Sequence, residues 1–248
     1  MVLRYDSRCV LPTPVTPANR LDHSLFEVAA GRTMESSAVH TDEEAGEYAE
    51  MIDRHAWLLN APFVRMVSSL GLASGKVLDV GTGPGWIPIQ LALRNPGWEV
   101  WALDASEDML ELGRRNAAAA GVGKRIHFVN GDACSLPFET GEFDLAVSHF
   151  MLHHMEEPGI VLDEMARVVH GGGRVIVKDL ARQPRWKAKL LLAFSKLILR
   201  YSPEQMRMYR ESLDSALTLK DARALLRRTR LSMAKVRSFR GLDYVISA

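Results

Sequence analysis

The feature that most constrains this chain is a glycine-rich turn that directly follows an apolar run. Residues 76–80 read Lys-Val-Leu-Asp-Val, the pattern of a buried strand, and Gly81, Gly83 and Gly85 follow at alternate positions. Glycine accepts positive φ and lets the backbone approach a ligand closely, and a following helix would point its unpaired N–H groups at the same place. The turn predicts a nucleotide-type binding loop at the end of a strand.

Asp79 lies inside the apolar strand, two residues before the first glycine. A carboxylate buried at that place is costly unless it has donors to hold, so we expect a binding site there. A dinucleotide-binding loop fits less well. Its fingerprint requires a third glycine at position 86 or just beyond, where this chain has Trp86 followed by Ile87 and Pro88.

Residues 77–85, Val-Leu-Asp-Val-Gly-Thr-Gly-Pro-Gly, resemble motif I of the class I S-adenosylmethionine-dependent methyltransferases. In that family the loop wraps the methionine end of the cofactor. The resemblance implies that S-adenosyl-L-methionine is the cofactor. It also implies cofactor contacts from the residues of the loop, which are Asp79, Gly81, Thr82, Gly83 and Gly85.

Strand and helix patterns alternate from the glycine turn to residue 180. We expect helices over about 86–94, 106–121 and 156–169, and strands over about 99–104, 125–129, 143–148 and 174–177. Strands separated by helices specify a parallel, doubly wound sheet, whose ligands bind outside the carboxyl ends of the strands. Two last strands, over about 231–239 and 242–246, would add an antiparallel hairpin. The predicted fold is α/β, with a Rossmann-like, seven-stranded, mostly parallel sheet like that of the resembling family.

Asp104 ends the second expected strand of this sheet, about twenty residues after the glycine turn. A carboxylate at that position can accept hydrogen bonds from both hydroxyls of an adenosine ribose, and the alternative is a cap for the helix that starts at Ser106. The resemblance implies further cofactor contacts beside the ribose and the adenine. These are Ala105, Met109, Gly131, Asp132 and Ala133.

Residues 148–154 follow the fourth expected strand, across the switch point of the sheet from the glycine turn. His149 is the candidate catalytic residue, as a general base or an orienting group for the acceptor, because histidine can accept a proton at neutral pH. It is also a candidate cofactor contact. His153 and His154 have no acidic partner at ligand spacing, so no metal site is expected.

The N-terminal part of the chain lacks the alternating pattern. Three closely spaced prolines predict that residues 1–40 form an extended or disordered arm, and residues 41–248 are expected to form one domain. Helical spacing predicts helices over about 41–59 and 63–70. In the resembling family such helices close over the cofactor, which makes Tyr48 a candidate contact. The alternative is an aromatic residue at an interface.

Residues 181–217 interrupt the alternation and are expected to form a helical lid over the acceptor. They combine a broad apolar surface with no acidic residue over 183–202. Their basic residues follow one stripe of the first helix, at Arg185, Lys189, Lys196 and Arg200. A helix of this kind packs on the protein or lies against an apolar partner, so membrane contact is the alternative.

Charge is distributed unevenly along the chain. Residues 1–180 carry 15 Lys and Arg against 25 Asp and Glu, whereas residues 181–248 carry 16 against 5. The basic part suits an anionic acceptor, a membrane surface or a polynucleotide, and the simplest alternative is a set of solvated helix faces. Cys9 and Cys134 are too few for a disulfide framework, and no segment approaches the ~18 apolar residues of a membrane span. We therefore expect a cytoplasmic protein.

The motifs together predict a methyltransferase that acts on a small-molecule or lipidic acceptor and resembles the quinone-methylating branch of the family. Nucleic acid is not the expected partner. Adenine and glutamine amide N-methyltransferases carry Asn-Pro-Pro-Tyr where residues 148–151 read Ser-His-Phe-Met, and Cys134 lacks the Pro-Cys context of RNA cytosine C5 enzymes. Three alternatives remain: another reaction of the same cofactor, a nucleic-acid methyltransferase that uses the basic C-terminal region, and a non-catalytic S-adenosylmethionine-binding module.

Overall fold

A computed structural model describes residues 32–33 and 60–248 of the chain. The predicted helix over 41–59, with Tyr48, lies outside these residues, as does nearly all of the predicted arm over 1–40.

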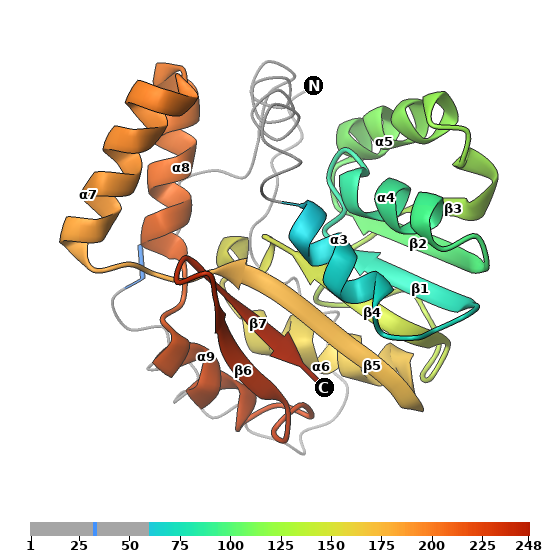
Figure 1. Cartoon of the computed structure of the whole chain (residues 1–248). Coiled ribbons are helices and arrows are strands. Elements are labelled where there is room, and N and C mark those ends of the chain that lie inside the picture. The colour runs from blue at the N-terminus through green and yellow to red at the C-terminus, as the bar shows by residue number, and fades with distance from the viewer. Residues whose placement is uncertain (1–31, 34–59) are drawn as a thin grey trace, which may run out of the picture.

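A seven-stranded sheet runs through the molecule in the order β3-β2-β1-β4-β5-β7-β6 (Figure 1). Its strands are β1 (Gly75–Val80), β2 (Trp98–Asp104), β3 (Ile126–Asn130), β4 (Phe143–His149), β5 (Val169–Leu180), β6 (Lys235–Phe239) and β7 (Asp243–Ser247). Strands β1 to β5 are parallel, and β7 runs antiparallel to both β5 and β6. The strand order reverses between β1 and β4, which is the switch point of a doubly wound sheet. The predicted fold class is confirmed.

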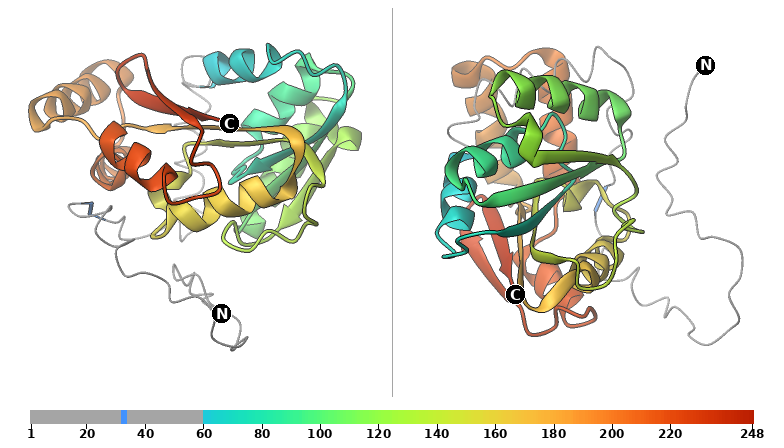
Figure 2. Two further views of the ribbon diagram at one scale, coloured as in Figure 1. Left: turned by 90° about the horizontal axis from the view of Figure 1, so that it is seen from below. Right: turned by 90° about the vertical axis from the view of Figure 1, so that its right-hand side faces the viewer.

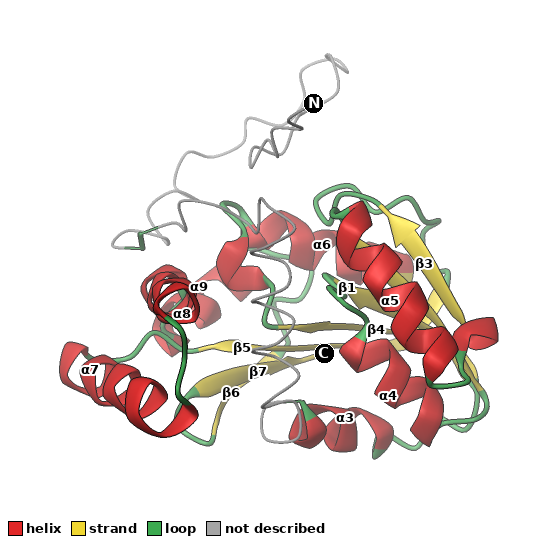
Figure 3. Ribbon diagram, turned by 90° about the horizontal axis from the view of Figure 1, so that it is seen from above, coloured by secondary structure: helices red, strands yellow, loops and turns green. Residues whose placement is uncertain are grey.

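Helices cover both faces of the sheet and enclose two apolar cores (Figure 3). On one face, α3 (Ala61–Ser68), α4 (Trp86–Arg94) and α5 (Glu107–Ala119) pack over Val77 and Val100. On the other face, α6 (Pro158–Val168) and α9 (Leu219–Leu226) pack over Leu78 and Val80. Alternate residues of β1 thus point to opposite cores, as the period of a strand requires.

Local sequence signals set most helix boundaries. Helix α4 has its predicted ends, and α5 begins after Ser106, whose Oγ accepts a hydrogen bond from the Met109 N–H at 3.3 Å. Capping boxes start α8 (Pro203–Ser215) at Ser202 and α9 at Thr218. In each box the cap side chain and the third helical residue satisfy one another's backbone N–H groups.

Two strands differ from their predicted lengths. Strand β5 begins at Val169 instead of about 174, because Val169 pairs with Phe143 of β4 as soon as α6 ends. Three glycines at 171–173 interrupt the apolar pattern there, so the sequence did not indicate a strand. Strand β6 begins at Lys235 instead of about 231, because Ser232 and Ala234 donate backbone hydrogen bonds within successive turns.

The region 181–217 is helical and lies at the end of the molecule away from α5 and β3 (Figure 2). It consists of α7 (Arg185–Phe194), a π-helical turn η3 (Ser195–Leu199) and α8. No residue of α7 is buried, although the sequence led us to expect that this helix would bury one side on the sheet domain. Across the described parts of the chain, no helix has both the length and the apolar content of a membrane span.

Candidate functional site

The glycine turn after β1 has a backbone conformation in which other residue types would be strained. Gly81, Gly83 and Gly85 have φ values of 74°, 53° and 83°, in the left-handed region. The turn is held on β2, because the Leu103 carbonyl accepts the N–H groups of Gly81 at 2.9 Å and Thr82 at 3.0 Å. A Cβ at Gly81 would lie 2.3 Å from Met151 Cγ, whereas a Cβ at Gly83 would meet no described residue within 4 Å. Space for a ligand is therefore open beside Gly83.

Asp79 is buried at the end of β1, immediately before this turn. One of its oxygens, Oδ2, accepts a hydrogen bond from the Thr82 hydroxyl at 2.7 Å. The other oxygen, Oδ1, is buried without a partner in the described structure. Burial raises the pKa of this carboxyl to about 7, with the Thr82 hydrogen bond opposing the shift. A buried acceptor without a donor is uncommon in a folded protein and points to a ligand group.

Asp104 connects the glycine turn to the start of α5. Its Oδ2 accepts the Gly83 N–H at 2.7 Å, and its Oδ1 accepts the Ser106 N–H at 3.0 Å. Burial raises the pKa of Asp104, and these backbone N–H groups offset part of that effect. Each carboxylate oxygen has a second lone pair, so Asp104 can still accept hydrogen bonds from ligand hydroxyls. Beside it, Ala105 is exposed and Met109 is buried.

The turn after β3 lies next to the turn after β2. The Gly131 N–H donates to the Asp104 carbonyl at 3.0 Å, and a Cβ at Gly131 would lie 3.1 Å from Leu103 Cδ1. Asp132 is exposed, its Oδ1 accepts the Cys134 N–H at 2.8 Å, and Ala133 is buried. The structure thus brings the predicted residues of three separate segments to one edge of the sheet.

His149, at the end of β4, lies among aromatic rings. Its ring centroid is 4.7 Å from that of Phe63 on α3 and 4.1 Å from that of Phe150. Its Nε2 lies 3.2 Å from Nζ of Lys178, a buried lysine of β5 that forms an ion pair with Asp243 Oδ2 at 3.0 Å. Burial lowers the pKa of Lys178, and the Asp243 charge opposes this. A charged Lys178 donates to Nε2, which leaves the proton of His149 on Nδ1.

A second histidine, His153, pairs with a buried carboxylate that sequence reasoning missed. Asp179 Oδ1 lies 2.6 Å from His153 Nδ1, and Oδ2 accepts the His153 N–H at 2.9 Å. Arg32 donates from Nη2 to the carbonyls of His153 at 2.9 Å and Met155 at 3.0 Å. The usable signal was the pair Lys178-Asp179 at the end of an apolar strand, because buried charges there need partners.

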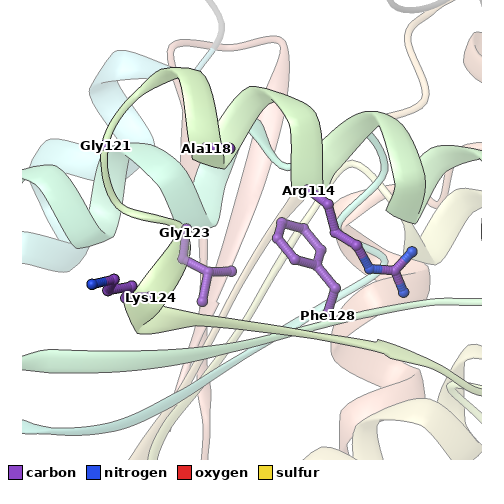
Figure 4. A pocket seen from close by; sticks show the side chains of 7 residues that line it. Arg114, Ala118, Gly121, Gly123, Lys124 and Phe128 are labelled. Carbon is purple, nitrogen blue, oxygen red and sulfur yellow. The ribbon is translucent and has the colours of Figure 1, made fainter.

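No cluster of three or more metal-ligating side chains occurs among residues 60–248 or at Arg32 and Thr33. An open hollow of about 600 Å³ lies elsewhere, between α5 and β3 (Figure 4). It contains none of the predicted site residues, and its Arg114 forms ion pairs with Glu107 and Glu111. The hollow is therefore separate from the candidate site.

Comparison with known proteins identifies a family that part of the chain matches. Residues 78–177 match the family described as methyltransferase domain. These residues form a methyltransferase domain. The methyltransferase domain includes all the predicted site residues except Tyr48.

Two relatives match part of the chain. A demethylmenaquinone methyltransferase of Clavibacter sepedonicus is 38% identical over 113 residues, 46% of this chain and 44% of the relative. A release factor glutamine methyltransferase of Chlorobaculum tepidum is 54% identical over 79 residues, 31% of this chain and 27% of the relative. The chain thus spans less than half of the length of either relative.

A solved structure shows the same fold over almost the whole chain. The plantazolicin methyltransferase BpumL in complex with SAH (S-adenosylhomocysteine) superposes with a TM-score of 0.69 at 14% identity, covering 91% of this chain and 97% of that one. The chain therefore has the Rossmann-like fold of that methyltransferase, with the antiparallel strands β6 and β7 after the matched residues 78–177.

Proposed function

We propose that the chain binds S-adenosyl-L-methionine and transfers its methyl group to a small-molecule or lipidic acceptor. The observation that carries this proposal is Oδ1 of Asp79 beside the glycine turn, which has no partner among the described residues. An unsatisfied buried acceptor costs roughly 1–3 kcal/mol, and a ligand with a cationic or N–H group would remove that cost. The cofactor carries both an ammonium group and a sulfonium. The open space beside Gly83 fits a ligand at this position.

The cofactor would extend along the carboxyl ends of β1, β2 and β3. Around its methionine end we place Asp79, Gly81, Thr82, Gly83 and Gly85. Asp104, with Ala105 and Met109, would hold the ribose, and the adenine would lie against Gly131, Asp132 and Ala133. Tyr48 and His149 are the two remaining proposed contacts. The bound cofactor supplies an electrophilic methyl group, so the chain's own task is to place the acceptor in line and exclude water.

We assign His149 the role of orienting the acceptor. A charged Lys178 donates to Nε2 of the imidazole and so holds the ring in position at the end of β4. The stacked rings of Phe63, His149 and Phe150 offer an apolar surface to a flat acceptor.

The acceptor class follows from this surface and from the relatives. The Clavibacter relative is named for a quinone, which is a flat lipidic molecule. The Chlorobaculum relative is named for a protein glutamine, but this chain has Ser-His-Phe-Met at 148–151 where amide N-methyltransferases carry Asn-Pro-Pro-Tyr. We therefore favour the small-molecule or lipidic acceptor, and the basic C-terminal region suits an anionic group on it.

We propose further that residues 41–248 act as one domain in which 181–217 covers the acceptor. Helix α8 packs against the short 3-10 helix η2 (Leu152–His154) that follows β4. Arg32 links the two, because it donates to the Ser215 carbonyl at 2.6 Å and to the His153 carbonyl. Limited trypsin digestion tests this arrangement: cleavage between Arg182 and Arg210 should slow when cofactor and acceptor are both bound.

Transfer of labelled methyl groups tests the proposed activity. The chain is incubated with methyl-labelled S-adenosylmethionine and a fractionated cell extract, and the labelled compound is identified. Formation of S-adenosylhomocysteine with a labelled small molecule is the expected result. Methylthioadenosine would show another reaction of the cofactor, labelled nucleic acid would show the nucleic-acid alternative, and tight binding without turnover would show a binding module.

Calorimetry tests the binding step separately. Both S-adenosylmethionine and S-adenosylhomocysteine should bind with micromolar affinity, or about 8 kcal/mol. Asp104→Ala should weaken this by roughly 1.5–3 kcal/mol, the scale of a charge-assisted hydrogen bond. Asp108→Ala is the matched control, because Asp108 is an exposed acid in the first turn of α5. NADH binding in place of either compound would refute the cofactor assignment.

A further inference from the structure

Helix α7 and the turn η3 present a concentrated apolar surface to solvent. Eight large apolar side chains are exposed in the described residues, and five of them lie in this segment. Their exposed fractions are 66% for Trp186, 61% for Leu190, 49% for Phe194, 72% for Leu197 and 65% for Ile198. Single exposed apolar residues are ordinary, but a contiguous group marks an interaction surface. We call these five residues the interfacial face.

Helical spacing places the interfacial face on one side of the segment. Trp186, Leu190, Phe194 and Ile198 recur every four residues, so they form a continuous row. The opposite side is directed at the protein, where Ser195 is buried and α7 packs against α8. Figures 1 and 3 show α7 on the outer side of α8. The interfacial face therefore points away from the sheet.

Basic residues run along one border of this face. Arg185, Lys189, Lys196 and Arg200 are all exposed and fall together on the helix circumference. No acidic residue occurs over 183–202 to balance them. A helix with an outward apolar row and an adjacent cationic row has the chemistry of an element that lies in the plane of an anionic membrane surface.

The hairpin between β6 and β7, next to α7, also exposes a basic and an apolar side chain. Lys187 donates to the Gly241 carbonyl and so ties α7 to the hairpin between β6 and β7, where Arg240 and Leu242 are exposed. The nearby acids are largely neutralised. Glu204 and Glu211 of α8 form ion pairs with Arg207, and Asp243 of β7 with Lys178, while Asp214 at the end of α8 is exposed.

We propose that the interfacial face docks this protein on an anionic lipid bilayer. The apolar row would enter the boundary between head groups and acyl chains, and the basic row would contact lipid phosphates. A second copy of this chain suits the face less well, because symmetric pairing of the two faces would bring the two basic rows together. Docking of this kind does not depend on the methyl transfer proposed above.

Sedimentation with vesicles tests this docking on the full chain. The protein should bind vesicles of phosphatidylcholine mixed with phosphatidylglycerol, bind pure phosphatidylcholine vesicles much less, and dissociate as salt is raised. Lys189→Ala and Lys196→Ala should each lower partitioning about fivefold. Trp186→Ser combined with Leu197→Ser should abolish it. Matched controls are Lys124→Ala and Leu93→Ser, which change an exposed lysine and an exposed leucine far from α7 and should leave binding unchanged.

Thermal melting of each variant confirms that the fold is kept, since all these side chains are exposed. Equal vesicle binding by the wild type, Lys189→Ala and the Trp186→Ser and Leu197→Ser double variant would overturn the proposal. So would an absence of binding to phosphatidylglycerol vesicles. Self-association that disappears in the double variant, without vesicle binding, would assign the face to a second copy instead.

Discussion

A single residue, Asp79, should lower the stability of the cofactor-free fold and raise the affinity for the cofactor. Its pKa of about 7 lies above the value of about 3.9 for an unfolded chain. Between these values the folded state holds a proton that the unfolded state has lost, so this carboxyl makes the cofactor-free fold less stable as pH rises from about 4 to about 7. Asp79→Asn should therefore stabilise the cofactor-free protein at about pH 8, by at most about 4 kcal/mol at 1.36 kcal/mol per pKa unit.

Urea unfolding near pH 5 and pH 8 measures this effect as the difference between wild type and variant. Subtracting the variant removes the contributions of other carboxyls whose pKa is raised, such as Asp104 and Asp243. If Asp79→Asn lowers the free energy of unfolding equally at both pH values, the contacts of Asp79 stabilise the fold and burial of its charged form does not destabilise it.

The same carboxyl should make cofactor affinity depend on pH. A cationic ligand favours ionised Asp79, so binding near pH 6 must release a proton that is already absent near pH 8. We expect affinity for S-adenosylmethionine to rise up to about tenfold per pH unit below 7 and to level off above it. Calorimetry in buffers of different ionisation enthalpy counts the released proton. Affinity that is independent of pH would show that Oδ1 does not meet the ligand's charge.

His149 offers a test of orientation against proton transfer. His149→Ala should lower turnover about a hundredfold or more, with little change in cofactor affinity. His149→Asn places an amide N–H close to the position of Nδ1–H, so it should recover much of the lost turnover if the residue orients the acceptor. Rates measured with the acceptor found by label transfer decide between the roles. Equal loss in both variants would identify His149 as a base.

The strand-turn-helix element around the glycines can be tested with a matched pair of substitutions. Gly81→Ala and Gly83→Ala both force alanine into left-handed backbone, which costs about 1–2 kcal/mol. Only the Cβ at Gly81 meets Met151, so that variant should lose about 1–3 kcal/mol more from overpacking. Gly83→Ala should instead weaken cofactor binding more, because its Cβ enters the open space. Urea midpoints and calorimetry measure the two effects, and the reverse order would contradict the proposed ligand position.

The elements that the sequence predicted well are those whose signals are local. The start of α5 at Ser106 and the glycine turn at Gly81 depend on residues within a few positions of one another. Strand β5 was predicted too short because its first residues owe their conformation to pairing with β4. The π-helical turn η3 had no sequence signal that we recognised.

The same distinction applies to the candidate site. Asp79 and Asp104 were found because each stands next to a recognisable turn. Lys178 and Asp179 were overlooked because their importance comes from His149 and His153, which lie 29 and 26 residues away in the chain. Asp243 is farther still in sequence and meets Lys178 only through the antiparallel pairing of β5 with β7. Spacing along one strand does not reveal such contacts.

At the scale of the whole molecule, the strand order places the proposed cofactor site, His149 and the proposed membrane-binding helix side by side across the sheet. The proposed cofactor residues lie at the ends of β1, β2 and β3, while α7 contacts the hairpin of β6 and β7 at the other edge. Strands β4 and β5, which carry His149 and Lys178, lie between them. An acceptor that arrived from a membrane beside α7 would therefore meet His149 before it reached the cofactor.

The cofactor should stabilise the molecule as a unit, because its proposed contacts come from segments that are distant in sequence. At a free concentration one hundred times the dissociation constant, a ligand that binds only the folded state adds about 2.7 kcal/mol. For a chain of this size that corresponds to a rise in Tm of about 5–10 °C. S-adenosylmethionine and S-adenosylhomocysteine should both produce it in a thermal scan, and NADH should not. Asp104→Ala, with binding weakened by roughly 1.5–3 kcal/mol, should cut the rise at the same ligand concentration to half or less, because stabilisation varies with the logarithm of affinity. A full rise in that variant would show that the ribose is held by other residues.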